Sequence, residues 1–428
     1  MTIGSYYVWT IGCQMNKADS ERLESALDKL GMEPHSSPQS ADLIVLNSCV
    51  VRQSAEDKVT GMLTSLKPVK NSKQDRIIAL MGCMVGPNSD SLRSKFPYVD
   101  VFMRPQEYEP LMDFLGEKFG IETEGCLADL TSSKQDISTY IPIIHGCDEF
   151  CSFCIIPYRR GRQKSRTIED IAKEVRHLTS RGVKEITLLG QTVDAYGHDL
   201  YDPRDLSDLM TAIHDTDGLD RIRFLTSHPK YMSDKIIGSI ADLPKVCEHI
   251  NLPFQAGDDE VLINMRRGYK SSDYKDLVQK IRDRIPAVSL STDVIVGFPG
   301  ETESQFESTL DLIREIQFDK VHIAAYSPRQ NTIAIRKMPD DVSSLEKKTR
   351  VQRLEEVQQG ISEKINKRLL GRTLEVLIDR KAGDKLQGRT RNDKLVFVES
   401  QEDYLGQTVN IEISKTGPWS LQGELPKQ

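Results

Sequence analysis

The sequence lacks long hydrophobic runs, an excess of positive charge and any segment typical of export. No stretch approaches the ~20 consecutive apolar residues of a membrane-spanning helix, so we expect no membrane contact. The opening residues, MTIGSYYVWTIGC, have neither the basic and apolar regions of a secretory signal nor the arginines of a transit peptide, which predicts a cytoplasmic protein. The formal net charge of −7 argues against wholesale wrapping of nucleic acid but does not exclude local basic patches.

Internal repeats and low-complexity segments are also missing from the sequence, so a repeat-built chain is not expected. The 38% hydrophobic content is enough for ordinary buried cores. At roughly 100–200 residues per domain, the 428 residues predict two to four domains. Against this ordinary composition the eight cysteines stand out, because clustered thiols in a reducing compartment more often bind metal or do chemistry than form disulfides.

The first part of the chain alternates strand-like and helix-like segments. Apolar runs at 6–12, 42–47 and 76–80 are typical of buried strands, and leucines at helical spacing follow the first of them. Buried strands that alternate with helices predict a parallel sheet, so we assign 1–126 to an N-terminal α/β domain. The sequence then turns polar, and 127–138 is predicted to be a linker.

A longer strand–helix series fills 139–368. Helix-like stretches separate six strand candidates, at 141–146, 185–190, 222–227, 248–253, 289–297 and 321–327. Six βα units are too few for the eight of a closed barrel, so we predict an open, partial (β/α)6 barrel. After a long helix over 351–365, short alternating segments separated by Gly, Asp and Asn predict a small antiparallel β-barrel over 369–428. The fold class as a whole is α/β.

Three cysteines, Cys147, Cys151 and Cys154, form a C-x3-C-x2-C pattern directly after the first strand of the longer series. Loops at the carboxyl ends of such strands are where α/β barrels build their sites. Three thiolates cannot complete a tetrahedral zinc site, and His145 is expected on the strand, so a zinc knuckle is the weaker alternative. An iron–sulfur cluster held by three cysteines keeps one iron open to a small molecule with an amine and a carboxylate.

Three further cysteines, Cys13, Cys49 and Cys83, are far apart in the sequence but share a structural position. Each lies at or just past the carboxyl end of a predicted strand, and such ends share one edge of a parallel sheet, where open α/β sheets bind ligands. Gly12 and Gly82 each precede a cysteine and let the backbone approach a bulky ligand closely. The pattern leaves open whether the three thiols converge or are separate buried cysteines.

The loop pattern, with an aromatic residue before its last cysteine, resembles that of the radical S-adenosylmethionine enzymes. TDVIVGFPGET at 292–302 is similar to the strand that lines the adenine site in that family. The resemblance implies a [4Fe–4S] cluster on the loop cysteines, which binds S-adenosylmethionine and cleaves it to methionine and a 5′-deoxyadenosyl radical. The residues that it suggests for cofactor binding are Phe153, Gln191, Ser227 and Asp293.

The segments around the scattered cysteines, TIGCQMNKADSERL, LNSCVVRQSAEDKVTG and GCM, resemble the N-terminal domain of the methylthiotransferases. This resemblance covers nearly the whole chain and includes a C-terminal TRAM-like barrel. It implies a second, auxiliary [4Fe–4S] cluster on Cys13, Cys49 and Cys83. Cys126 and Cys247 match neither pattern, and we interpret them as structural.

Within this family, GCQMN, LLGQTVDAYG and LPFQAGDDEVLINMRRGY look like the MiaB-type enzymes, which modify tRNA. Thr192, Asp194 and Asn331 depart from the residues usual in that type. The implied reaction puts a methylthio group on C2 of an N6-isopentenyl-type modified adenosine beside the anticodon, and it uses two S-adenosylmethionine molecules. Because the C–H bond that is replaced has no acidic proton, a radical suits it better than a general base.

Basic residues follow the cysteine loop, and a half-polar β-barrel can offer stacking surfaces for unpaired bases. The candidate RNA-binding residues are Arg159, Arg160, Arg162, Arg389 and Phe397. A solvated charge run and core packing are the plainer explanations of the arginines and the aromatic ring. The implied partners are the tRNA anticodon stem-loop and a flavodoxin- or ferredoxin-like electron donor, with the protein itself a monomer and the sulfur donor open.

Two other functions are compatible with the sequence. The nearer is a RimO-type enzyme, which methylthiolates an aspartate of a ribosomal protein. The more distant is a non-catalytic, zinc-dependent RNA-binding protein, which would use the same cysteines as structural ligands.

Overall fold

The computed structural model describes residues 3–425 apart from 51–52, 74, 129 and 133–135. It divides the chain into two compact units. The first comprises Met1–Lys134, His145–Phe150 and Cys154–Lys164, and the second comprises Gln135–Ile144, Cys151–Phe153 and Ser165–Gln428. The predicted linker 127–138 includes residues outside the described part, and the predicted domain boundaries stay predictions.

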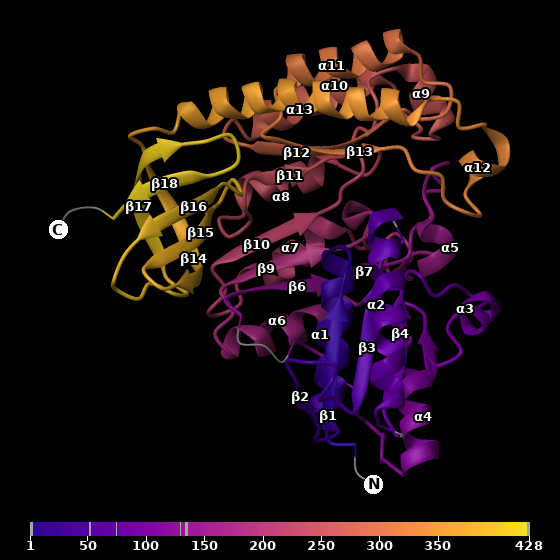
Figure 1. Cartoon of the computed structure of the whole chain (residues 1–428). Coiled ribbons are helices and arrows are strands. Elements are labelled where there is room, and N and C mark those ends of the chain that lie inside the picture. The colour runs from indigo at the N-terminus through magenta and orange to yellow at the C-terminus, as the bar shows by residue number, and fades with distance from the viewer. Residues whose placement is uncertain (1–2, 51–52, 74, 129, 133–135, 426–428) are drawn as a thin grey trace. The chain divides into compact units, whose positions relative to one another are not determined.

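A parallel sheet forms the centre of the first unit (Figure 1). Its strands follow the order β2-β1-β3-β4-β5, where the bounds are β1 Ser5–Thr10, β2 Glu33–Pro34, β3 Leu43–Ser48, β4 Ile77–Gly82 and β5 Val101–Met103. Its helices are α1 Gln14–Lys29, α2 Gln53–Asn71, α3 Asp90–Lys95 and α4 Glu109–Phe119. The three predicted strands are β1, β3 and β4. The short edge strands β2 and β5 have no apolar run long enough to reveal them.

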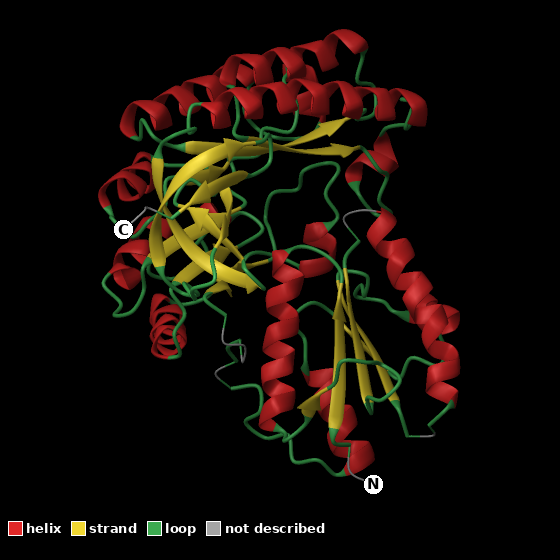
Figure 2. Ribbon diagram, turned by 60° about the vertical axis from the view of Figure 1, so that its left-hand side comes forward, coloured by secondary structure: helices red, strands yellow, loops and turns green. Residues whose placement is uncertain are grey.

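The sheet of this unit is covered on both faces (Figure 2). Alternate side chains of a strand point to opposite faces. Leu43 and Val45 therefore pack with residues of α1 and α4, whereas Ile44 and Leu46 pack with residues of α2. Burial on both faces explains why β3 and β4 are continuous hydrophobic runs in the sequence.

The second unit contains six barrel strands as two parallel sheets, β10-β9-β6 and β11-β12-β13. Five match the predicted strands, whereas the first, predicted at 141–146, lies earlier, at 138–142. A bridge between Ile222 and Val246 continues the pairing from one sheet to the other, which gives the open, partial barrel expected from six βα units. The bounds are β6 Ser138–Pro142, β9 Glu185–Leu189, β10 Arg221–Leu225, β11 His249–Asn251, β12 Ser289–Val296 and β13 Lys320–Ala325. Two short strands flank the cysteine loop and pair with each other: β7 Ile144–His145 precedes the loop and β8 Lys164–Ser165 follows it.

Helices connect these strands and pack outside them. Their bounds are α6 Ile168–Ser180, the 3₁₀ helix η1 Val193–Ala195, α7 Leu206–His214, α8 Asp234–Asp242, α9 Asp259–Asn264, α10 Ser271–Arg284, α11 Glu303–Ile316, α12 Ile333–Lys337 and α13 Ser344–Lys367. The short helix α5 Ile156–Arg160 lies in the first unit. The long helix α13 runs along β12 and β13 in Figure 1 and buries Leu354 and Ile361 in the barrel core. In the described part of the chain, no helix is both long and apolar enough to cross a membrane.

The C-terminal segment forms a closed barrel in the order β14-β15-β16-β18-β17. The bounds are β14 Thr373–Ala382, β15 Lys385–Thr390, β16 Leu395–Glu399, β17 Thr408–Thr416 and β18 Leu421–Glu424. The prediction of a small barrel is confirmed, but the expectation of purely antiparallel pairing is wrong, because β16 and β18 are parallel. A closed ring with an odd number of strands cannot alternate direction throughout, so one neighbouring pair must be parallel.

The loop between β15 and β16 anchors this barrel to the amino ends of β9–β11 within the second unit. Arg223 donates hydrogen bonds to Glu185 (2.8 Å) and to the carbonyl oxygens of Thr390 (2.7 Å) and Arg391 (2.8 Å). Arg391 in turn forms a bidentate pair with Glu248, with N–O distances of 2.9 and 2.8 Å. Because these strongly hydrogen-bonded pairs are directional, they fix the orientation of the small barrel on the partial barrel.

Replacement of Arg391 by alanine is expected to lower the free energy of unfolding by roughly 1–3 kcal/mol, since a half-buried charged hydrogen-bond pair is lost. Urea denaturation, followed by a signal from the second unit, measures the change in the free energy of unfolding. The matched control is Lys381→Ala, which removes an exposed 3.8 Å ion pair with Asp403 in the same barrel and should cost less than about 1 kcal/mol. Equal losses for both variants would contradict the anchoring role of Arg391.

Candidate metal centres

The three scattered cysteines come together at one edge of the N-terminal sheet. Cys13, Cys49 and Cys83 directly follow or nearly follow β1, β3 and β4. The backbone N–H of Cys83 donates to the carbonyl oxygen of Ser48, the residue before Cys49, at 2.8 Å. A methyl group on Gly12 would lie only 2.9 Å from Cβ of Cys49, so the chain before Cys13 passes against the second cysteine.

A buried polar network holds these strand ends in register. Asn16 donates from Nδ2 to Oδ1 of Asn47 (2.9 Å) and to the carbonyl oxygen of Ser48 (3.1 Å). Asn47 returns a hydrogen bond to the carbonyl oxygen of Asn16 (2.8 Å). Both amides are fully buried, so each lost bond would leave an expensive unsatisfied group. Cys13 joins the network through a 3.2 Å contact from its thiol to Oδ1 of Asn16.

Two glycines allow the close approach of the strand ends. Gly82 has φ +95°, and a Cβ there would lie 2.5 Å from the carbonyl oxygen of Ser48 and even closer to Asn47. Gly12 has φ +152°, and its Cβ would lie 2.5 Å from Oδ1 of Asn16. Glycine is therefore required at both positions by backbone conformation and by space.

Arg160 brings positive charge to this edge from within the same unit. Its Nη2 donates to Oδ2 of Asp19 at 2.8 Å, and the two side chains are only 2% and 0% exposed. Burial raises the pKa of the Cys83 thiol to about 11, while the charge of Arg160 opposes that rise. Burial alone would lower the pKa of Arg160, but the charges of Asp19, Cys83 and Cys13 raise it above its usual range.

The cysteine loop is shaped by a close backbone approach. The N–H of Cys147 donates to the carbonyl oxygen of Gly161 at 3.2 Å. Gly146 has φ +63°, and a Cβ there would collide with the carbonyl group of Arg162. Cys147 and Cys154 pack in the apolar cluster of the first unit that also contains Cys83.

The middle of the loop is bound within the second unit. Arg267 is 5% exposed and donates from Nη1 to Sγ of Cys151 at 3.4 Å and from Nη2 to the carbonyl oxygen of Pro253 at 2.9 Å. Ser152 adds hydrogen bonds to the carbonyl oxygens of Met265 (3.0 Å) and Asn264 (2.7 Å). These contacts hold the middle of the loop, with a buried guanidinium directly against the sulfur of Cys151.

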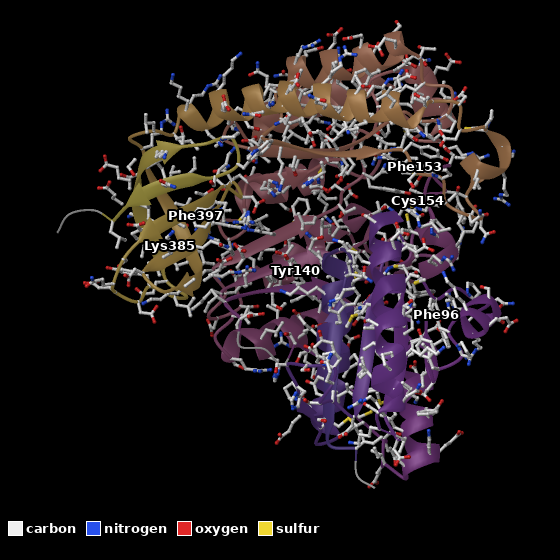
Figure 3. All side chains as sticks on the ribbon, viewed as in Figure 1. Phe96, Tyr140, Phe153, Cys154, Lys385 and Phe397 are labelled. Atoms are coloured by element: carbon white, nitrogen blue, oxygen red, sulfur yellow. The ribbon has the colours of Figure 1, made fainter. Side chains whose placement is uncertain are left out.

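The four residues suggested for cofactor binding lie in the second unit: Gln191 and Ser227 just after β9 and β10, Asp293 within β12, and Phe153 in the loop. Phe153, labelled in Figure 3, packs beside Phe298 and Tyr326. Ser227 is buried, and its hydroxyl makes no hydrogen bond within the described residues. Asp293 accepts from Nδ2 of Asn251 at 3.2 Å. Gln191 follows β9 and is partly exposed. Their roles stay predictions.

The donors present suit iron–sulfur clusters. Both groups consist of thiols, the soft ligands that such clusters use, and all eight cysteines of the chain are thiols rather than disulfides. Among the described residues, no three His, Cys, Asp or Glu side chains are placed tightly enough to hold a single metal ion. The thiols that hold a four-iron cluster lie farther apart than the ligands of a single ion, because each thiolate binds a different iron.

The candidate RNA-binding residues differ in exposure. Arg162 is 71% exposed and pairs with Asp148 at 3.2 Å, and Arg159 is half-buried against Gly86. Arg160 is the clear departure from expectation, because its ion pair with Asp19 is buried and unavailable to a phosphate.

The two candidates in the C-terminal barrel lie on its outer face. Arg389 is 37% exposed and donates to Asp393 at 3.0 Å. Phe397, labelled with Lys385 in Figure 3, points outward because its neighbours Val396 and Val398 fill the barrel core.

Sequence reasoning missed the residues that support the cysteines. Asn16, Asp19 and Asn47 lie in the quoted segments around Cys13 and Cys49, but no spacing distinguishes them from surface polar residues. Arg267 lies in a quoted segment as well. The signal that could have found them is polarity at positions where the helix or strand period predicts burial. Cys126 and Cys247 are buried, Cys126 beside Met112 in the opposite face of the sheet and Cys247 before β11.

Family models match three parts of the chain. The Radical SAM superfamily matches residues 141–313, the uncharacterized protein family UPF0004 matches 5–104, and the TRAM domain matches 367–425. Among solved structures, the radical S-adenosylmethionine methyltransferase TsrM from Kitasatospora setae is similar with TM-score 0.56 and 14% identity over 78% of each chain. The cobalamin-dependent S-adenosylmethionine radical enzyme OxsB gives TM-score 0.57 and 11% identity over 86% of this chain and 68% of its own. These structures share the fold.

Curated relatives match from end to end. A protein of Herpetosiphon aurantiacus named tRNA-2-methylthio-N(6)-dimethylallyladenosine synthase is 48% identical over 98% of this chain and 97% of its own length. A Roseiflexus protein of the same name is 47% identical over 99% of this chain and 90% of its own length. With its two sets of three thiols and its C-terminal barrel, the chain belongs to the radical S-adenosylmethionine methylthiotransferase family, in the branch of these tRNA enzymes.

Proposed function

We propose that this chain transfers a methylthio group to C2 of an N6-isopentenyl-type modified adenosine next to the anticodon of tRNA. The observation that carries the proposal is the convergence of Cys13, Cys49 and Cys83 on one sheet edge, in a chain that also has the radical-enzyme cysteine loop. A radical enzyme that only cleaves S-adenosylmethionine needs the loop alone. A methylthiotransferase also needs a place to hold sulfur, and three thiols at a sheet edge provide it.

The cofactors are two [4Fe–4S] clusters and S-adenosylmethionine. When bound, a cluster with an open iron supplies an electron for reductive cleavage of S-adenosylmethionine, which gives a radical able to remove an unactivated hydrogen. Cys147, Cys151 and Cys154 hold the cluster for this step, and Arg267 positions Cys151 through a hydrogen bond to its sulfur. Cys13, Cys49 and Cys83 hold the auxiliary cluster. Gln191, Ser227 and Asp293, together with Phe153, are the proposed cofactor-binding residues.

The anticodon stem-loop of tRNA is the proposed RNA partner. Arg162 and Arg159 are suited to phosphate contacts by position, and Arg389 with Phe397 offers a charge and an aromatic face on the small barrel. We further propose a monomer that works in the cytoplasm and receives electrons from a flavodoxin- or ferredoxin-like protein. The sulfur donor is not assigned.

The end-to-end similarity to curated tRNA enzymes favours this function over methylthiolation of a ribosomal protein. Mass spectrometry of tRNA nucleosides from a strain without this protein tests the choice directly. We expect the methylthio group to be missing from the adenosine and to return when the gene is restored. Unchanged nucleosides, together with a ribosomal protein that has lost its methylthio group, would support the alternative.

The two cysteine sets should fail in different ways because they do different chemistry. Cys147→Ala, Cys151→Ala or Cys154→Ala should abolish reductive cleavage of S-adenosylmethionine and the modification of tRNA. A combined Cys13→Ala, Cys49→Ala, Cys83→Ala protein should still form 5′-deoxyadenosine with dithionite but leave tRNA unmodified. Both products are measured in one reaction, with circular dichroism as the control for folding.

Continued methylthiolation by the scattered triple variant would refute the auxiliary role of that set. Loss of both products by the same variant, with an intact circular dichroism spectrum, would show that the two sites are not separable.

Gly82→Ala should prevent loading of the auxiliary cluster alone, because a Cβ there collides with the carbonyl oxygen of Ser48 and the backbone has φ +95°. After anaerobic reconstitution, we expect roughly eight irons per natural chain and about four in this variant, given four irons per cluster. Gly61→Ala is the matched control, since it lies in the same unit with nothing within 4 Å of the added methyl group. Full iron content in Gly82→Ala would contradict the described edge.

Arg162→Ala should weaken tRNA binding and reduce the slope of log affinity against log salt by about one unit if one phosphate contact is lost. Filter binding at several salt concentrations measures the slope. Arg284→Ala serves as the control, because Arg284 forms a comparable exposed pair with Asp242 (2.6 Å, 52% and 62% exposed) on α10. An unchanged slope for Arg162→Ala would mean that this arginine only solvates the surface.

A further inference from the structure

Arg160 is a buried arginine whose hydrogen-bonding capacity is mostly unused. Its side chain is 2% exposed, and Nη2 donates to Oδ2 of Asp19 at 2.8 Å. Within the described residues, its Nε and Nη1 are buried without any hydrogen-bond partner. A buried N–H group without a partner is costly, so two of them on one guanidinium indicate that an acceptor belongs there.

A second buried arginine in the same unit shows what a purely structural role looks like. Arg76 is 3% exposed and lies at the amino end of β4, the end opposite to Cys83. Its three side-chain nitrogens all donate hydrogen bonds, to the oxygen atoms of Ala41, Val69, Ser72 and Gln39. Arg160, with one nitrogen satisfied out of three, is therefore not explained as a fold-stabilising arginine.

The position of Arg160 is fixed by its partner Asp19, which is itself held by two further hydrogen bonds. Oδ1 of Asp19 accepts from Nε2 of Gln106 at 2.9 Å, and the hydroxyl of Tyr108 donates to the carbonyl oxygen of Asp19 at 3.0 Å. Gln106 adopts φ +67°, an unusual conformation for a residue that is not glycine. Strain of this kind persists where the surrounding structure over-determines it, frequently at functional sites. Asp19 therefore fixes the orientation of the Arg160 guanidinium in addition to neutralising its charge.

Asp19 lies one turn of α1 after Asn16, whose Oδ1 contacts the thiol of Cys13 at 3.2 Å, so its partner Arg160 is held next to the auxiliary cysteines. Cys83 and Cys13 both act on the charge of Arg160, and Arg160 acts on Cys83 in return. We propose that Arg160 is a further residue of the auxiliary site, where it donates hydrogen bonds from Nε and Nη1 to sulfur of the iron–sulfur group held by Cys13, Cys49 and Cys83. This inference rests on the proposed function and adds to it a residue that sets the electron affinity and retention of that group.

The direction of the effect follows from charge. A positive group beside an iron–sulfur cluster stabilises the reduced, more negative form, and hydrogen bonds to its sulfur atoms do the same. Removal of Arg160 should therefore lower the reduction potential of the auxiliary cluster. Removal of the negative charge of Asp19 should raise it, because Asp19 acts with the opposite sign on the same cluster.

The test uses the full-length chain with Cys147, Cys151 and Cys154 all changed to alanine, so that the auxiliary cluster gives the only iron–sulfur signal. Arg160→Gln and Asp19→Asn are made in this background, reconstituted anaerobically and titrated potentiometrically with detection by electron paramagnetic resonance. We expect a lower midpoint potential for Arg160→Gln and a higher one for Asp19→Asn. Loss of iron to a chelator should be about 10–100-fold faster in Arg160→Gln, as for other partners of metal ligands.

Arg76→Gln is the matched control, a buried arginine lost from the far end of the same sheet, and it should leave the midpoint potential unchanged. If Arg160→Gln does not fold, Arg160→Lys carries the test: it keeps the charge but loses the planar fork, so iron loss should accelerate with little change of potential. Iron-loaded variants whose potentials and iron loss match the background overturn this inference alone. A background protein that binds no iron overturns the auxiliary site itself and this inference with it.

Discussion

The reciprocal hydrogen bonds between Asn16 and Asn47 are the interaction on which the auxiliary site depends. They join the start of α1 to the end of β3, and through Ser48 they reach the N–H of Cys83. Because both amides are fully buried, the strand ends cannot slide without leaving unsatisfied polar groups. The strand ends that carry the proposed ligands Cys13, Cys49 and Cys83 are therefore held in register by protein contacts.

Each cysteine set is accompanied by one buried arginine. Arg267 donates to the sulfur of Cys151, and Arg160, paired with Asp19 on α1, has two donors without a partner in the described part of the chain. The two arginines differ in their counter-charges: Arg160 is paired with Asp19, whereas Arg267 is held by neutral oxygens of Pro253 and Tyr269. A cationic donor near thiolates lowers the cost of placing several negative sulfurs in a dry site.

The sequence was sufficient to predict the strands whose hydrophobic pattern is strong, together with the placement of the cysteines relative to them. This was possible because the carboxyl ends of parallel strands lie at the same edge of a sheet. A residue that directly follows such a strand can therefore be placed at that edge from the sequence. The sequence did not predict the short strands β2 and β5, because they depend on pairing with neighbouring strands. Nor did it predict the parallel pair β16–β18, which follows from closure of the barrel. Arg160 was assigned to RNA because it belongs to a basic run that directly follows the cysteine loop. Its burial follows from Asp19, which lies 141 positions earlier in the chain.

The central claim is that the strand-end cysteines alone hold a complete cluster. Mössbauer spectroscopy of ⁵⁷Fe-reconstituted chain that lacks the three loop cysteines tests it most directly. The account predicts the spectrum of a single [4Fe–4S] cluster from about four irons per chain. Its isomer shift and quadrupole splitting should match those of one of the two clusters in the unmodified protein. Mononuclear iron, or no bound iron in a folded chain, would contradict it.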